Sequence, residues 1–183
     1  MDTVAIFGLQ FFLSMTVVAL LARWYLSPWL AKKPLAIALA VLTIPHAFRH
    51  LGMAFLVPGL VSESIPGHFA FVAAYGDLLS GVLALLVLVA LRNEWVFSLF
   101  LAVIFNIVGA VDLLYALSNA EAIPHLQTTW YIPTFVVPVL LVTHAMSAML
   151  LWQSFRGTRA EIYTSEALAC LLYTSPSPRD LAR

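Results

Sequence analysis

Five apolar stretches, separated by short polar joins, account for most of the chain. They cover residues 4–25, 35–60, 69–91, 95–117 and 131–152. Each stretch is long enough to cross a bilayer core of roughly 30 Å as an α-helix, which needs about 20 residues. Hydrophobic residues make up 62% of the 183 residues and charged residues only 10%, which is more apolar surface than a soluble fold of this size could bury. The sequence therefore predicts an all-α, polytopic membrane protein, in which residues 1–160 form a bundle of five transmembrane helices.

The overall charge and the cysteine content exclude several classes of function. The net charge is zero, so the chain lacks the basic surface with which proteins bind polyanions, and we expect no nucleic-acid partner. One cysteine excludes a disulfide framework and a thiolate zinc site. The expected surroundings are a lipid bilayer.

Residues 161–183 differ from the rest of the chain in composition. Residues 170–180 read CLLYTSPSPRD, a string that resembles the translated sequencing-adapter tail of open reading frames assembled from environmental DNA. We therefore expect a metagenomic chain whose residues 161–183 are a non-native or disordered tail, and such segments are left out of fold reasoning. Cys170 lies inside this string and is given no role.

Positive charge alternates from one join to the next. Lys32 and Lys33 lie in the first join, Arg92 in the third, and Arg156 and Arg159 after the fifth span, whereas the second and fourth joins contain no lysine or arginine. Positively charged joins stay on the cytoplasmic side of a membrane. The pattern predicts an N-terminus outside and a C-terminus inside.

A small set of polar residues lies within the predicted spans, where ionisable groups are costly and by default mark a functional site. A rise of about 1.5 Å per residue places three of them near the middle of the membrane and four nearer the outer face. The middle layer contains His46, Asn106 and His144, and the outer layer contains Arg49, His50, Asp77 and Asp112.

His46, Arg49 and His50 are spaced i, i+3, i+4, so an α-helix would place all three on one face, directed into the bundle. A guanidinium keeps its charge at any accessible pH and needs a carboxylate partner at this depth. We therefore expect an ion pair between Arg49 and Asp77 or Asp112. Pro45 directly precedes His46 and is expected to kink the second span at the polar residues.

His46 and His144 lie at similar depth on different spans, and this arrangement has three interpretations. The two imidazoles could be the axial ligands of a haem b. They could bind another metal ion with carboxylates completing the site. They could also be neutral, hydrogen-bonded core histidines. The segment HAFRH lacks the glutamate of the HExxH motif, so a zincin-type metalloprotease is excluded.

Four segments carry a resemblance when taken together. They are IPHAFRHLG at 44–52, AAYGDLL at 73–79, FNIVGAVDLLYA at 105–116 and YIPTFVVPVLLVTH at 131–144. In this order and spacing they resemble an uncharacterised family of small bacterial five-span integral membrane proteins with no known activity. The resemblance implies a location in the bacterial cytoplasmic (inner) membrane and implies no activity.

These features predict a membrane protein whose buried His/Arg/Asp site binds or transports a small molecule or an ion. A single five-helix bundle is small for alternating access, so a homodimer is expected. Three alternatives stay open: a haem b-binding electron-transfer subunit, a metal-dependent membrane enzyme, and a structural or assembly subunit in which the polar residues only fix helix packing. The sequence does not decide whether the protein is an enzyme.

Overall fold

The computed structural model describes residues 2–157. Within these residues the chain is helical, and five segments are long and apolar enough to span a membrane: Thr3–Ala31, Leu35–Leu56, Gly67–Arg92, Ser98–Ser118 and Gln127–Phe155. The all-α, five-span architecture is therefore confirmed. Arg159, Cys170 and the tail 161–183 lie outside the described residues.

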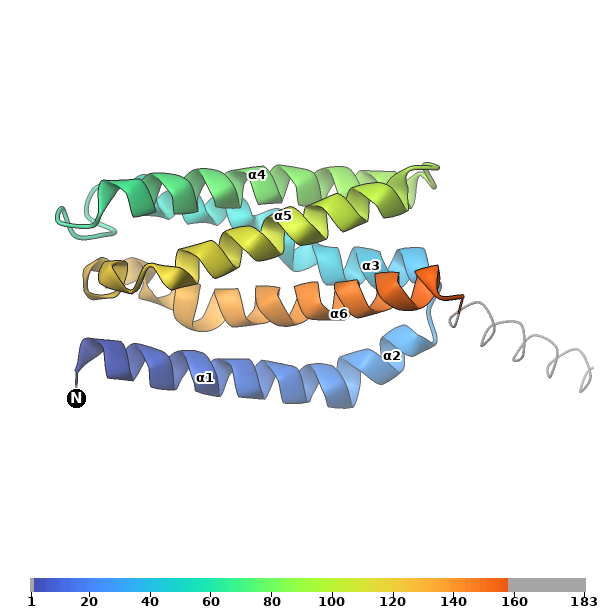
Figure 1. Ribbon diagram of the computed structural model, residues 1–183, viewed down its shortest axis with the longest axis horizontal. Helices are drawn as coiled ribbons and strands as arrows, with labels where there is room; N and C mark the ends of the chain where they lie inside the picture. The colour runs from blue at the N-terminus through green and yellow to red at the C-terminus, as the bar shows by residue number, and fades with distance from the viewer. Residues whose placement is uncertain (1, 158–183) are drawn as a thin grey trace, which may run out of the picture. The chain divides into compact units, whose positions relative to one another are not determined.

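The spans are built from several consecutive helical elements (Figure 1). In chain order these are α1 (Thr3–Leu21), η1 (Ala22–Leu26), α2 (Ser27–Ala31), α3 (Leu35–Thr43), η2 (Ile44–Leu56), α4 (Gly67–Arg92), α5 (Ser98–Ser118), η3 (Ala120–His125), η4 (Gln127–Trp130), η5 (Ile132–Val136) and α6 (Val137–Phe155). Residues 2–148 belong to one compact unit, which contains every candidate site residue, and the end of α6 belongs to a second. In that second unit the Arg156 guanidinium lies 4.4 Å from the centre of the Trp152 ring.

Three of the spans change helix type next to a proline. The five-residue π-helices η1 and η5 precede Pro28 and Pro138, and the 3₁₀-helix η2 begins one residue before Pro45. A proline lacks the N–H that would bond the carbonyl four residues earlier, so the regular α-helical ladder is interrupted there. The kink expected at Pro45 is therefore realised as a change from an α-helix to a 3₁₀-helix.

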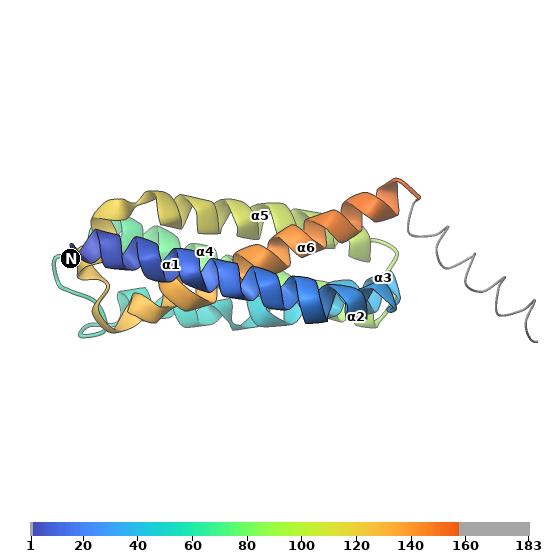
Figure 2. The same cartoon turned by 90° about the horizontal axis from the view of Figure 1, so that it is seen from below.

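The 3₁₀-helix η2 determines which side chains of the second span are buried. Its buried residues are His46, Arg49, Gly52 and Phe55, which recur at every third position. A 3₁₀-helix has three residues per turn, so residues at i and i+3 lie directly above one another. This face packs against α4, and α4 also packs against α5 (Figures 1 and 2).

The joins 57–66 and 119–126 meet at one end of the bundle. We call it the cavity end, because residues of the join 119–126 line a cavity there. The backbone N–H of Ser62 donates to the His125 carbonyl at 2.9 Å, and Thr128 Oγ1 donates to the Leu60 carbonyl at 2.8 Å. Beneath these bonds lies an apolar cluster that includes Phe55, Val61, Phe69, Ala73 and Leu126. The second span ends at Leu56 rather than near residue 60, because Pro58 and Gly59 form a turn in which Gly59 has a positive φ of 84°.

The first span lies at the periphery of this unit. None of the residues of α1 is buried, as expected for a helix that is apolar on all sides and surrounded by lipid. Near the cavity end, Trp130 Nε1 donates to Gln10 Oε1 at 2.6 Å, and the Trp130 ring packs edge-on against Phe7. These contacts fix α1 beside the segment that leads into α6.

Candidate functional site

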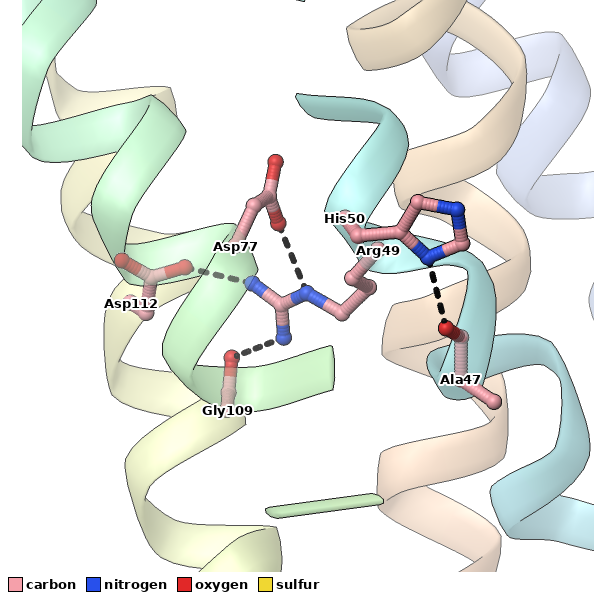
Figure 3. Close-up of polar contacts among 6 residues, drawn as sticks. All are labelled: Ala47, Arg49, His50, Asp77, Gly109 and Asp112. Carbon is pink, nitrogen blue, oxygen red and sulfur yellow. Dashed lines mark hydrogen bonds and ion pairs between the residues drawn. The ribbon is translucent and has the colours of Figure 1, made fainter. Parts of the chain in front are cut away.

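Arg49 lies between two carboxylates from two neighbouring helices (Figure 3). Its Nε donates to Asp77 Oδ1 on α4 at 2.7 Å, and its Nη2 donates to Asp112 Oδ2 on α5. Its Nη1 donates to the Gly109 carbonyl at 3.1 Å. The expected ion pair is therefore present with both aspartates, and every nitrogen of the guanidinium has an acceptor.

This cluster is buried and its charges do not balance. Arg49 is 3% exposed and Asp77 is 8% exposed, while Asp112 is partly buried. Charges removed from water need partners, since an isolated buried charge is very costly. One guanidinium compensates one carboxylate, so the cluster carries one excess negative charge whenever both aspartates are ionised.

Two glycines on neighbouring helices make room for the carboxylates. A Cβ atom at Gly52 on η2 would overlap the Asp77 side chain, and one at Gly76 on α4 would overlap the carboxylate of Asp112. Any larger residue at either position would push an aspartate away from Arg49. The cluster thus depends on close backbone approach as well as on charge.

His46 and His144 are in direct contact. Their ring centroids are 4.1 Å apart, and the Phe105 ring lies 5.1 Å from His46 and 5.2 Å from His144. His46 Nε2 is 2.9 Å from Thr143 Oγ1, and His144 Nδ1 is 3.0 Å from Asn106 Oδ1. The three residues expected in the middle layer are therefore brought together, with Thr143 as an additional member.

The contact between the two imidazoles does not fit a haem held between them. A bis-histidine haem places the whole porphyrin ring between its axial imidazoles, and a centroid separation of 4.1 Å leaves no space for one. Among residues 2–157, no group of three His, Cys, Asp or Glu side chains with the arrangement of a metal site is found. His46 and His144 lie as a pair of imidazoles packed against Phe105.

His50 does not join the site, contrary to its expected position beside His46 and Arg49. Its side chain is exposed, and its Nδ1 donates to the Ala47 carbonyl at 3.0 Å (Figure 3). The expectation assumed an α-helix, in which i and i+4 share a face. In the 3₁₀-helix η2 a residue at i+4 is rotated by about one third of a turn from residue i, so His50 faces outward.

A narrow cavity connects the cavity end of the bundle with the two aspartates. Its walls include Phe55, Phe69, Asn119 and Leu126, and Asp77 and Asp112 lie along it. Its volume is about 40 Å³, enough for a few water molecules. No sequence pattern pointed to Asn119 or Thr143. Gly52 and Phe55 share a three-residue spacing with His46 and Arg49, which indicates a common face only once the helix is known to be a 3₁₀-helix.

Five membrane-spanning helices around a buried cluster of one arginine and two aspartates define a multi-pass membrane protein. Residues 6–152 match the family described as "Domain of unknown function (DUF8737)". The chain belongs to this family, in agreement with the uncharacterised family that its four segments resemble. No curated protein and no solved structure matches the chain.

Proposed function

We propose that this membrane protein binds a monovalent cation, either a proton or a small metal ion, at the cluster of Arg49, Asp77 and Asp112. The observation that carries the proposal is the charge imbalance, because two carboxylates share one guanidinium in a buried position. A second cation at the cluster would neutralise the excess charge. Ionisable groups inside membranes commonly form such ion and proton sites.

The size of the cavity favours an ion over a small organic molecule. The cavity along Asp77 and Asp112 has a volume of about 40 Å³, and a second cavity, lined by Arg49 and Asp77, has a volume of about 220 Å³. Both are below the roughly 300–1,000 Å³ of typical small-molecule sites. The arrangement also disfavours an anion, since every nitrogen of the Arg49 guanidinium already donates to Asp77, Asp112 or Gly109. The cation would reach the aspartates from the cavity end.

Exchange of Asp112 for asparagine tests this proposal. Asp112→Asn leaves a balanced pair of Arg49 and Asp77, so we expect a folded protein that takes up one proton or metal cation fewer per chain. Proton uptake is counted near neutral pH, where an ordinary solvated carboxyl group is already ionised, with an indicator dye in weakly buffered solution. Proton release on addition of Na⁺ or K⁺ shows whether a metal ion competes. Glu63→Gln, the same change at an exposed residue of a join, is the matched control for Asp112→Asn.

The structural alternative gives a different result in this experiment. If the polar residues only fix helix packing, wild type and Asp112→Asn would bind equal numbers of protons and neither would respond to Na⁺ or K⁺. Equal numbers of bound protons in wild type and Asp112→Asn would contradict the proposed cation site. A difference that also appears in Glu63→Gln would place the binding group outside the cluster.

The proposal includes an orientation in the bacterial inner membrane, with the cavity end outside. Lys32, Lys33 and Arg92 lie in the joins opposite the cavity end, and the joins of the cavity end contain no lysine or arginine. By the positive-inside rule the cavity opens to the exterior, and two copies would associate to transport an ion. Reporter fusions after residue 64 and after Asn93 should report exterior and cytoplasmic locations, respectively. The reverse pattern would overturn this orientation.

A further inference from the structure

The hydrogen bonds of the two buried imidazoles fix which nitrogen of each carries a hydrogen. Thr143 Oγ1 lies 2.9 Å from the Val139 carbonyl and 3.0 Å from the Leu140 carbonyl. Carbonyls only accept, so the single hydroxyl hydrogen of Thr143 is directed to them. His46 Nε2 is therefore the donor in its 2.9 Å bond to Thr143 Oγ1.

The same reasoning applies to His144. Its Nδ1 faces Asn106 Oδ1 at 3.0 Å, and an amide oxygen only accepts, so Nδ1 carries the hydrogen. The other two nitrogens, His46 Nδ1 and His144 Nε2, then present lone pairs. Both atoms are buried and have no hydrogen-bond partner, although buried polar groups are nearly always paired.

We propose that His46 Nδ1 and His144 Nε2 form a proton-accepting pair that takes over the proton held by the carboxylate cluster. This inference rests on the proposed function and specifies its cation as a proton. Two bare nitrogens on rings 4.1 Å apart are suited to accepting a proton on either ring. Histidine is the side chain that most commonly serves as a proton shuttle.

Gly109 connects the imidazole pair with the carboxylate cluster. A Cβ atom at Gly109 would lie 2.7 Å from His144 Nε2 and 3.1 Å from Arg49 Nη1, so these two atoms border the same space above the glycine. His46 precedes Arg49 on a span that runs toward the cavity end, and therefore lies farther from that end. The imidazole pair thus extends the polar path past Arg49.

The transfer conserves the charge of the buried residues. An O–H bond of Asp77 or Asp112 breaks, an N–H bond forms on His144 or His46, and the carboxyl becomes a carboxylate. The Arg49 guanidinium repels the resulting imidazolium, so the pair holds the proton only transiently and passes it on or returns it to a carboxylate.

Flux and binding measurements on histidine variants test the pair. Proteoliposomes that contain a pH-sensitive dye report proton flux under an imposed pH gradient. We expect His144→Gln and His46→Gln to keep the exchangeable proton of the carboxylate cluster but to reduce the flux by about a hundredfold, the lower range of what a positioned proton-transfer group contributes. Asp112→Asn should lose both the exchangeable proton of the carboxylate cluster and the proton flux. His50→Gln, at an exposed histidine of the same helix, is the control and should behave as wild type.

Nitrogen NMR of wild type in bilayers supplies a second measurement that does not require a variant to fold. We expect His46 Nδ1 and His144 Nε2 to be bare, and His46 Nε2 and His144 Nδ1 to carry hydrogens. If either proposed acceptor nitrogen carries a hydrogen in the resting protein, or if both histidine variants conduct as well as wild type, the imidazole pair is not the acceptor. If wild type has no exchangeable proton at the cluster, it is the proposed cation site that fails.

Discussion

Arg49→Ala is expected to lower the free energy of unfolding by about 3–5 kcal/mol, the usual cost of removing one partner of a buried ion pair. The change leaves Asp77 and Asp112 without a counter-charge in the interior of the bundle. Protonating both carboxyl groups would relieve their repulsion but would leave their oxygens without the donors that Arg49 supplies. The midpoint of unfolding in detergent measures this loss.

Removal of the remaining charges should restore much of the lost stability. A triple variant, Arg49→Met with Asp77→Val and Asp112→Val, contains no ionised group in the cluster and leaves no polar side chain there without a partner. Buried ion pairs can be replaced by hydrophobic residues of similar volume at little cost, so we expect the triple variant to be more stable than Arg49→Ala. Arg23→Ala removes an exposed arginine of η1 and should remain within about 0.5 kcal/mol of wild type. If Arg49→Ala unfolded at the same point as wild type, Arg49 would not be a buried charged residue.

The spans and the Arg–Asp contacts could be predicted from the sequence because each rests on a large energy term. Apolar length determines what can cross a bilayer, and a permanent charge at membrane depth requires a carboxylate of similar depth. Only Asp77 and Asp112 meet this requirement within the spans. The sequence left open whether one aspartate or both bind Arg49, since depth alone does not tell which side of a helix faces the arginine.

The position of His50 could not be predicted because it depends on helix type. The residues His46, Arg49 and His50 fit an α-helix by spacing, and the 3₁₀ geometry of η2 turns His50 away from the others. Pro45 indicates an interruption but does not specify what replaces the α-helix. The regular spacing of His46, Arg49, Gly52 and Phe55 fits three residues per turn, and only the structure shows that this period applies.

The role of the glycines was also only partly predictable. Gly76, Gly81 and Gly109 are typical of close helix packing in membranes, and α4 and α5 do pack together. The sequence does not show that Gly76 and Gly109 lie against polar side chains. Asp112 and His144 occupy the space where a Cβ atom would be, so these glycines shape the site itself.

Gly76→Ala is therefore expected to destabilise the protein by about 1–3 kcal/mol or more, the range for overpacking a tight interior. In an ordinary helix the same change stabilises by about 1 kcal/mol, because alanine has the higher helix propensity. The sign differs at Gly76 because the added methyl group would overlap the carboxylate of Asp112. The overlap would move the carboxylate away from Arg49 and weaken the ion pair as well as the packing.

Two comparisons separate this overlap from a general sensitivity of the helices. Gly8→Ala places the same methyl group on α1, where no atom lies within 4 Å of the new Cβ, and should leave stability unchanged or slightly higher. Asp112→Ala removes the overlapping atoms, so addition of Gly76→Ala to that variant should cost little, and the two changes should show a coupling energy of about 0.5–3 kcal/mol. Equal losses from Gly76→Ala with and without Asp112 would mean that the glycine serves helix packing alone. A loss that disappears with Asp112 would establish that the fold leaves this space for the carboxylate that gives the cluster its excess charge.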